Sequence, residues 1–190
     1  MEELIKRCIE ICGGEEFVFS DGDIGSNILL IGEAPGENEI IQKKPFVGKA
    51  GKNLDEFIQI LGVKRGDVYI TNSVKFRPYK ISPKTGKRIN RSPSILEIRS
   101  FRALVQDELA LVDPSIIVTL GNTPLKQLLD EKSQIGDIHG KILKVNIGEK
   151  EYDLFPLYHP ASVIYRRELK QVYIEDLQKL KKYICENGIV

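Results

Sequence analysis

Two polar side chains in this 190-residue chain stand directly after short apolar runs, where they could take part in chemistry. The Asn72 side chain offers one donor and one acceptor on a planar group, which matches the paired donor and acceptor on a pyrimidine edge. By itself, such an asparagine more often caps a helix or forms a turn. His159 is one of two histidines, and because Pro160 follows it, we expect it at a turn. A lone histidine is usually structural, but its place after an apolar run favours a role in a site.

Two glycine-rich segments could bring backbone and aromatic groups to the same ligand. The segment Gly32-Glu33-Ala34-Pro35-Gly36 allows a tight turn whose N–H groups face a ligand. It lacks the spacing of a P-loop or a dinucleotide fingerprint, and in isolation it is an ordinary turn. Phe46 lies in the second segment, before an expected helix. An isolated phenylalanine is usually core, but in this polar setting its ring could be exposed and stack on a planar base.

Positive charge is clustered locally, although the net charge of the chain is only +1. Residues 68–96 contain no acidic residue, and their basic residues are Lys75, Arg77, Lys80, Lys84, Lys87, Arg88 and Arg91. Proline and glycine interrupt this segment, so we expect a loop or an irregular hairpin. Further basic residues flank Phe46 and follow His159, namely Lys43, Lys44, Lys49, Lys52, Arg166 and Arg167. A charged run is usually a solvated face, but three clusters near one site favour a phosphate backbone over a free small metabolite.

The elements that would position these residues alternate between strand and helix patterns. Expected strands cover 27–31, 67–71 and 115–120, and a hairpin around Gly148 covers 141–147 and 151–157. Expected helices cover 4–12, 50–61, 93–112 and 168–185, and another begins at Asn122. This order predicts an α/β fold, a three-layer sandwich around a central, largely parallel four-stranded sheet. Because ligands bind at the carboxyl ends of such strands, the glycine turn, Asn72 and His159 should converge on one crevice.

The composition is typical of one globular domain covering residues 1–190, with 42% hydrophobic and 29% charged residues. No apolar run approaches the roughly 20 residues of a membrane helix. The N-terminus has no signal-peptide core, so we expect a cytoplasmic protein with no membrane partner. Cys8, Cys12 and Cys185 are too few and too odd in number for a disulfide framework. We expect the protein to be a monomer.

The order and spacing of several short motifs resemble the family 4, iron–sulfur type, of the uracil-DNA glycosylase superfamily. The resemblance runs from Phe17 to about Arg167. Its motifs are GEAPGENE at 32–39, PFVGKAG at 45–51, YITNSVK at 69–75, RP at 77–78, NRSP at 90–93, IIVTLG at 116–121 and YHPA at 158–161. The resemblance implies a DNA-repair enzyme that flips uracil out of DNA and hydrolyses its N-glycosidic bond, leaving an abasic site.

The same resemblance implies how the base would be bound. Phe46 would stack on the flipped ring, and Asn72 would read its N3–H and O4. His159 would donate to O2, together with backbone N–H groups of the turn that contains Gly32, Glu33 and Ala34. These donors would stabilise the negative charge that develops on the departing uracil.

The resemblance also implies catalytic and DNA-binding roles. Ala34 stands where some superfamily members carry a water-activating aspartate, so catalysis would depend on stabilising the leaving group. Glu39 could order the water or exclude the methyl group of thymine, and we expect it to contribute to catalysis in one of these ways. Residues 163–166 occupy the position of the apolar wedge that fills the gap left by the base. The expected DNA contacts are Lys49, Lys75, Arg77, Arg91, Tyr165 and Arg166.

The sequence departs from the family pattern at the iron–sulfur cluster. Family 4 members hold a [4Fe–4S] cluster with four cysteines, two near the N-terminus and two between the second and third strands. Here Phe76 stands at the third position, and Ser100 or Phe101 stands at the fourth. Because a cluster held by one chain needs four thiolates, we expect no cluster, no other metal and no cofactor. Cys8 and Cys12 are then expected on the buried face of a helix.

Other departures and other functions stay open. Ile40 replaces a usual aspartate, and the basic segment between Pro78 and Asn90 looks like an insertion. The main alternative to a glycosylase is a nucleic-acid-binding member of the superfamily with weak or no catalysis. A small-molecule enzyme resembling a nucleoside hydrolase is a third reading, which the basic segment disfavours. The glycosylase reading requires Phe46, Asn72 and His159 to share one base-sized slot.

Overall fold

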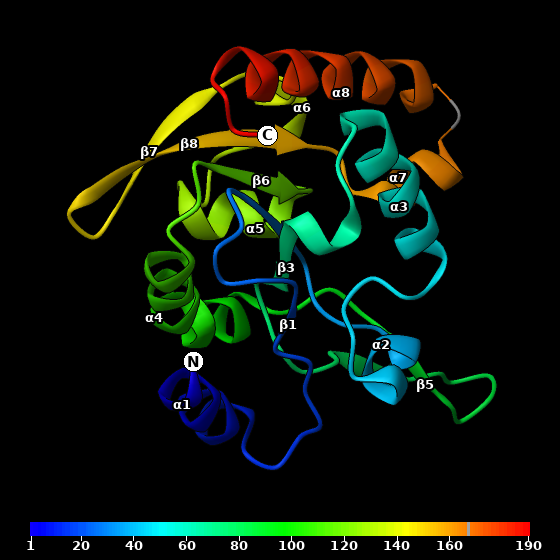
Figure 1. Ribbon diagram of the computed structural model, residues 1–190. Helices are drawn as coiled ribbons and strands as arrows, with labels where there is room; N and C mark the ends of the chain where they lie inside the picture. Colours follow the sequence, from blue (N-terminus) through cyan, green and yellow to red (C-terminus); the bar gives the residue numbers. More distant parts are fainter. Residues whose placement is uncertain (167) are drawn as a thin grey trace.

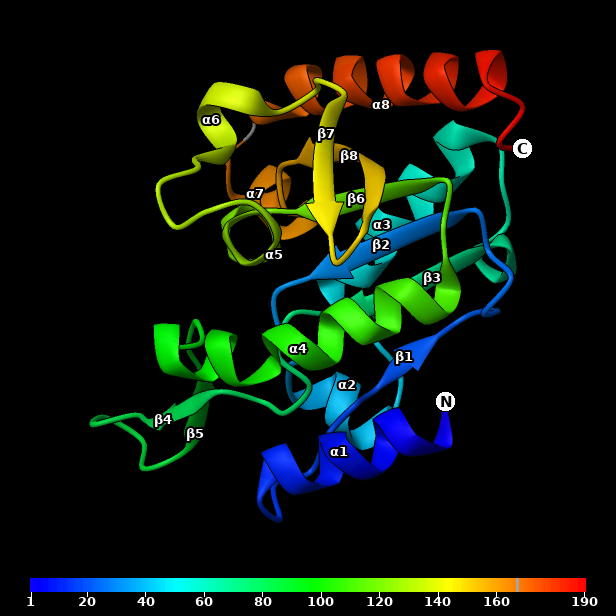
Figure 2. The same ribbon diagram turned by 90° about the vertical axis from the view of Figure 1, so that its left-hand side faces the viewer.

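A six-stranded sheet forms the centre of the computed structural model, which describes residues 1–166 and 168–190, with the backbone alone at 164 and 165. The strand order is β1-β3-β2-β6-β8-β7 (Figures 1 and 2). The strands are β1 (Ser20–Asp21), β2 (Ile28–Gly32), β3 (Val68–Asn72), β6 (Ile116–Leu120), β7 (Leu143–Ile147) and β8 (Lys150–Leu157). The four middle strands are parallel, and β1 and β7 are antiparallel edges. The predicted parallel strands are confirmed, and the two edges extend the sheet from four strands to six.

Helices cover both faces of the sheet, which explains why its inner strands consist mainly of apolar residues. α3 (Lys49–Leu61) and α8 (Leu169–Glu186) pack on one face, and α4 (Ile95–Val112) and α5 (Asn122–Leu128) pack on the other. Every residue of β2, β3 and β6 is buried, because alternate side chains enter the two cores. α1 (Glu2–Cys12) packs against α4 on the side away from the sheet (Figure 2). This layering confirms the predicted α/β sandwich.

The longer helices begin and end where the sequence indicates. α3 ends at Gly62, which has a left-handed φ of 84°. Ser94 caps α4 by accepting from the Glu97 N–H, and the Glu97 carboxylate accepts from the Ser94 N–H. The remaining helices, α2 (Glu37–Gln42), α6 (Ile135–Ile138), α7 (Pro160–Tyr165) and a 3-10 turn (Arg65–Asp67), are too short to show a helical period. Within the described residues, no helix combines the length and the apolar character that crossing a membrane requires.

The basic segment forms a separate two-stranded hairpin. β4 (Tyr79–Ile81) pairs with β5 (Arg88–Asn90), with Tyr79 opposite Asn90 and Ile81 opposite Arg88. The hairpin projects beyond the N-terminal end of α4, away from the central sheet (Figure 2). It matches the expected irregular hairpin in this segment.

The four parallel strands place their last residues along one edge of the sheet. Gly32 and Asn72 end neighbouring strands and are paired in register. Leu120 and Leu157 end the next two strands and are also paired. The chain leaves this edge toward α2, the hairpin, α5 and α7. Loops from four distant parts of the sequence therefore meet at one place, as expected for a parallel sheet.

Candidate active site

A cavity of about 530 Å³ opens at this edge of the sheet. Phe46, Asn72 and His159 all line it, although they come from three separate parts of the chain. The other walls come from the loop after β2, the beginning of α3, the β4–β5 hairpin and the beginning of α7. The volume lies within the range of small-molecule sites, about 300–1,000 Å³. The structure thus brings together the three side chains that the sequence analysis required to share one slot.

Gly32 allows two of these side chains to approach each other. A Cβ atom at Gly32 would lie 2.4 Å from Asn72 Oδ1 and 2.5 Å from Phe46 Cζ. Both distances are far below van der Waals contact, so any larger residue would displace the amide or the ring. The first glycine of the predicted turn therefore contributes by having no side chain.

Phe46 is held in an unusual backbone conformation. Its φ is 52°, a left-handed value that is uncommon for an aromatic residue. Behind it, a Cβ atom at Gly51 would lie 2.0 Å from the Phe46 carbonyl oxygen, so α3 packs directly on this backbone. The ring is buried and stacks beside the His159 imidazole, with centroids 5.8 Å apart and an interplanar angle of 27°. The surrounding loop therefore fixes the ring at the cavity wall.

Glu39 ties the two glycine-rich segments together. Its Oε1 accepts from the N–H groups of Val47, at 3.1 Å, and Gly48, at 2.9 Å. Its Oε2 accepts from the Gly36 N–H at 3.2 Å. Glu39 also lines the cavity. The carboxylate thus joins the turn after β2 to the residues that follow Phe46, a positional role that the sequence analysis did not consider.

The carboxamide of Asn72 lies at the end of β3, and the residue is almost fully buried. Among the described residues, no side-chain hydrogen bond involves the Asn72 amide group. Its donor and its acceptor therefore remain available to a ligand in the cavity. This geometry suits recognition of a base edge better than a turn or a helix cap.

The imidazole of His159 has a defined protonation pattern. Its Nδ1 accepts from the Ala161 N–H at 3.1 Å, which caps α7. Burial lowers the pKa of His159, and the Glu33 carboxylate opposes this shift to a smaller extent. The ring is therefore neutral near pH 7, with its proton on Nε2, which makes Nε2 a hydrogen-bond donor. The other histidine, His139, pairs with Asp176 and does not line the cavity.

The turn after β2 presents different residues to the cavity and to the body of the protein. Ala34 lines the cavity. The Glu33 side chain instead accepts from the Thr123 hydroxyl at 2.7 Å. The Glu33 carbonyl accepts from the Val74 N–H, and the Gly32 carbonyl accepts from the Ser73 N–H. These bonds fix the turn to the segment after β3, so the position of Ala34 depends on both strands.

Only some of the basic residues expected to contact DNA line the cavity. Lys49 and Arg77 line it, and Arg77 is paired with Glu37. Arg91 forms a two-pronged ion pair with Glu97 beside the hairpin. Arg166 is exposed at the end of α7. Arg167 and the side chain of Tyr165 lie outside the described residues, so the roles expected of this segment stay predictions.

Lys75 does not fit the predicted role in DNA binding. Its side chain is fully buried, and its Nζ donates to Glu108 Oε2 at 2.5 Å, to Thr71 and to the Phe19 carbonyl. Glu108 lies in α4 and also accepts from the hydroxyl groups of Tyr69 and Thr71. An ammonium group that neutralises a buried carboxylate cannot also reach a phosphate in solvent. Lys75 therefore belongs to the interior of the protein.

The region expected to hold a cluster in family 4 is an apolar layer in this chain. Cys8 and Cys12 lie on the buried face of α1, with their Sγ atoms 3.9 Å apart. Phe76 and Phe101 pack beside them, with ring centroids 5.9 Å apart. The contact with Cys12 and burial together raise the pKa of Cys8, which keeps its thiol protonated. Two thiols and two phenyl rings do not form a ligand set for an iron–sulfur cluster.

The sequence analysis missed part of the cavity wall. Arg88, Ile89 and Asn90 from the hairpin line the cavity, as does Ala161 at the beginning of α7. The basic run pointed to the hairpin as a charged surface, but no local pattern indicated that the chain would fold back over the site. A signal could have come from the family motif at 90–93, which begins at Asn90 and lies directly after Arg88 and Ile89.

Comparison with known proteins gives a consistent result. The sequence profile described as "Uracil DNA glycosylase superfamily" matches residues 19–181, a range that includes every residue lining the cavity. The chain is 38% identical over 174 residues to a type-4 uracil-DNA glycosylase of Saccharolobus solfataricus, which covers 89% of this chain and 76% of that protein. Proteins of the same name from Archaeoglobus fulgidus (34% identity, 84% and 77% coverage) and Thermotoga maritima (31% identity, 99% and 95% coverage) are also similar.

Proposed function

Because this chain belongs to the uracil-DNA glycosylase superfamily, we propose that the cavity at its sheet edge holds a uracil flipped out of DNA. Its activity is that of a uracil-DNA glycosylase, a DNA-repair hydrolase that cleaves N-glycosyl bonds. The observation that carries the assignment of the site is the convergence of Phe46, Asn72 and His159 on one cavity. A base inside a duplex cannot be reached by these groups, so the nucleotide must rotate out of the stack.

Each of the three side chains meets a different part of the base. Phe46 provides an aromatic face for the ring. The Asn72 amide donates to O4 and accepts from N3–H, a pair that cytosine cannot satisfy because it has an amino group at C4 and no proton on N3. His159 donates from Nε2 to O2. The free amide of Asn72 and the neutral state of His159 support these roles.

The reaction breaks the bond between C1′ of the deoxyribose and N1 of uracil. The bonding electrons leave with the base, so negative charge develops on uracil while the sugar becomes cationic. The oxygen of water then bonds to C1′ and the water releases one proton to the solvent, while the uracil anion takes up one proton from the solvent, which leaves an abasic site and free uracil. In this proposal, His159 Nε2–H donates to O2 as the negative charge develops there, and one such donor contributes about 3–4 kcal/mol by analogy with an oxyanion hole.

The cavity lacks a carboxylate at the position of Ala34, so activation of water from there does not contribute. Glu39 lines the cavity, but each of its oxygens already accepts from the backbone. Its main role is to hold the Phe46 segment in place, which makes it a positioning residue. Catalysis then depends chiefly on stabilising the departing base.

The positively charged residues around the cavity bind the DNA that carries the uracil. Lys49 and Arg77 lie at the cavity, and Arg91 and Arg166 lie further along the surface. The sugar–phosphate chain of a flipped nucleotide must remain at the mouth of the cavity, where cations bind its phosphates. We expect Tyr165, which follows the cavity-lining start of α7, to take part in the same surface.

The protein works without an iron–sulfur cluster. The layer of Cys8, Cys12, Phe76 and Phe101 supports this proposal, because side-chain packing fills the space between α1 and α4. Purified protein should be colourless and free of iron by elemental analysis. A brown preparation with close to four irons per chain would refute this part of the proposal.

The activity can be tested with an oligonucleotide that contains a single uracil, followed by alkali cleavage at the abasic site. The natural chain should give one cleaved product, and Asn72→Asp should weaken uracil excision because its second carboxylate oxygen repels O4. Asn187→Asp, a change of the same kind at an exposed residue beyond α8, is the matched control and should retain excision. Salt-dependent DNA binding without any cleavage would instead favour a binding protein, and unchanged excision in Asn72→Asp would contradict the role of the amide.

A further inference from the structure

The β4–β5 hairpin carries positive charges that no acidic side chain within the described part of the chain neutralises. Of the basic residues between 68 and 96, Lys75 is paired with Glu108, Arg77 with Glu37, and Arg91 with Glu97. The remaining four are Lys80, Lys84, Lys87 and Arg88. All four are exposed, and among the described residues none of them has an ion-pair partner. The hairpin is therefore a cationic element with its charge directed to solvent.

The base of the hairpin is fixed to the cavity by two arginines. Arg77 donates to the Asn90 side chain at 2.7 Å, to the Arg88 carbonyl and to Glu37. Arg91 donates to the Tyr79 carbonyl at 3.1 Å while its guanidinium is held by Glu97. These bonds join both strands to the body of the protein. These hydrogen bonds therefore fix the orientation of the hairpin relative to the cavity wall.

The exposed surface of the hairpin combines cations with uncovered apolar side chains. Ile81 and Ile89 are 57% and 39% exposed. The Arg88 guanidinium lies 4.3 Å from the centroid of the Tyr79 ring, which holds it near the cavity that Arg88 also lines. Cations beside apolar groups suit a partner that alternates phosphates with sugar and base faces, as a nucleic-acid strand does.

The length of the hairpin matches several nucleotides of such a strand. Four residue steps separate Asn90 at the cavity from Gly86 at the turn, which at about 3.3 Å per residue is roughly 13 Å. Nucleotides along one DNA strand rise about 3.4 Å each, so the hairpin can follow roughly three or four of them.

We propose that the β4–β5 hairpin is a second DNA-binding element, which contacts the phosphates that flank the flipped nucleotide through Lys80, Lys84, Lys87 and Arg88. This proposal rests on the proposed function, because the base in the cavity places its own strand beside the hairpin. Because this surface is positively charged, its partner is a polyanion. The proximity of Arg88, Ile89 and Asn90 to the cavity commits it to the same DNA that carries the uracil.

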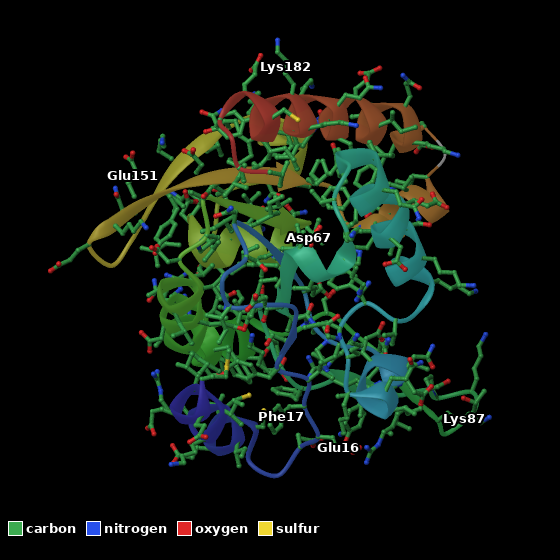
Figure 3. All side chains as sticks on the ribbon, in the orientation of Figure 1. Glu16, Phe17, Asp67, Lys87, Glu151 and Lys182 are labelled. Atoms are coloured by element: carbon green, nitrogen blue, oxygen red, sulfur yellow. The ribbon has the colours of Figure 1, made fainter. Side chains whose placement is uncertain are left out.

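Two variants with equal charge loss test the proposal. Lys84→Gln/Lys87→Gln removes two cations from the hairpin, and Lys181→Gln/Lys182→Gln removes two exposed cations from α8. Figure 3 shows Lys87 and Lys182 at opposite ends of the molecule. DNA affinity should be measured from 50 to 200 mM salt, together with single-turnover excision at saturating DNA.

The hairpin variant should lower the slope of log affinity against log salt by about two, since each phosphate contact contributes about 0.9. Over this range, the natural chain should therefore lose about tenfold more affinity than the hairpin variant does. The α8 variant should keep the natural slope. Excision at saturation should be unchanged in both, because neither pair lines the cavity.

The possible failures are distinguishable. If the hairpin variant and the α8 variant have the same slope while excision is normal, the hairpin does not contact DNA and the glycosylase assignment stands. If the natural chain binds DNA with a slope that depends on the hairpin but releases no uracil, the proposed function fails and the hairpin contact stands. The charge reversal Lys84→Glu/Lys87→Glu should weaken binding further, and unchanged affinity in that variant would also overturn the proposal.

Discussion

The cavity and the apolar layer of α1 and α4 meet just beyond β3, and each is stabilised by a different kind of interaction. In the cavity, Asn72 faces a polar space whose walls are fixed by hydrogen bonds, such as the three that Glu39 accepts. A few residues further along, Val74 and Phe76 enter the apolar layer that contains Phe101. The cavity depends on the direction of its hydrogen bonds and on its charged groups, whereas the apolar layer depends on close packing and on burial of its side chains. We expect changes in the first to alter turnover and changes in the second to alter stability.

Ala34 is the point of contact between the two regions. It lines the cavity and also packs against the layer of Cys8, Phe76 and Phe101. A metal cluster would fix such a layer through bonds to sulfur, whereas here side-chain packing fixes it, and Ala34 is held by this packing together with the backbone hydrogen bonds of its turn. The apolar layer can therefore support the fold alone, or it can also hold the turn after β2 that contains Ala34.

The largest expected effect lies in the apolar layer. Phe101→Ala should lower the free energy of unfolding by about 3–5 kcal/mol, because it leaves a cavity where a fully buried ring packs. Leu111→Ala on the exposed side of the same helix is the control and should change stability by less than about 1 kcal/mol. Denaturant unfolding measures both. If Phe101→Ala, while still folded, lost more than tenfold in excision, the two regions would not be separable.

In the cavity, we expect the largest effect from His159. His159→Ala should lower the single-turnover rate by about 10²–10³-fold, because it removes the donor to the departing base. Its free energy of unfolding should fall by only about 1 kcal/mol, for the lost cap of α7. His139→Ala should keep the natural rate, since His139 lies outside the cavity. A normal rate in His159→Ala would contradict the proposed electrostatic role.

Much of the fold was predictable because burial on both faces makes strands conspicuous. The runs at β2, β3 and β6 are mainly apolar. Gly62 marks a helix boundary by its left-handed backbone, and Ser94 marks one by its capping hydroxyl group. The edge strand β1 has only two residues, so it carries no period. Its pairing depends on β3, which lies about fifty residues further along the chain.

The residues of the site could be predicted from the sequence, but the contacts that hold them in place could not. Motif order and strand ends pointed to Phe46, Asn72 and His159, whereas the role of Glu39 depends on a loop conformation that no local pattern reveals. The environment of Lys75 could not be predicted from the sequence for the same reason. In the sequence it is one of seven similar cations, and only the packing of α4 brings Glu108 to it. Long-range partners, which no local residue pattern reveals, decide whether a lysine faces solvent or the interior.

A smaller effect on turnover would sharpen the role of Glu39. Glu39→Gln presents an amide where a carboxylate oxygen accepts an N–H, so one charge-assisted bond worth about 1.5 kcal/mol is lost and the excision rate should fall about tenfold. Glu16→Gln, at an exposed carboxylate that does not line the cavity, should have no effect. The pH profile of Glu39→Gln should keep its natural shape. If the excision rate instead fell by 10²–10⁴-fold and its pH profile lost the decline on the acidic side, Glu39 would act as a general base.

The smallest effect concerns pH, and it tests whether the polar region depends on neutral His159. Burial lowers its pKa below the usual value of about 6.5. The unfolded chain therefore binds this proton more readily, so the contribution of His159 to stability falls as pH decreases from about 6.5 toward the lower folded pKa. The excision rate should stay flat from pH 8 to below 6.5 and then decline, because a protonated Nδ1 cannot accept from Ala161. His159→Gln should lack this decline, and a natural profile in which the rate falls as the pH rises above 7 would mean that His159 is charged in the active protein.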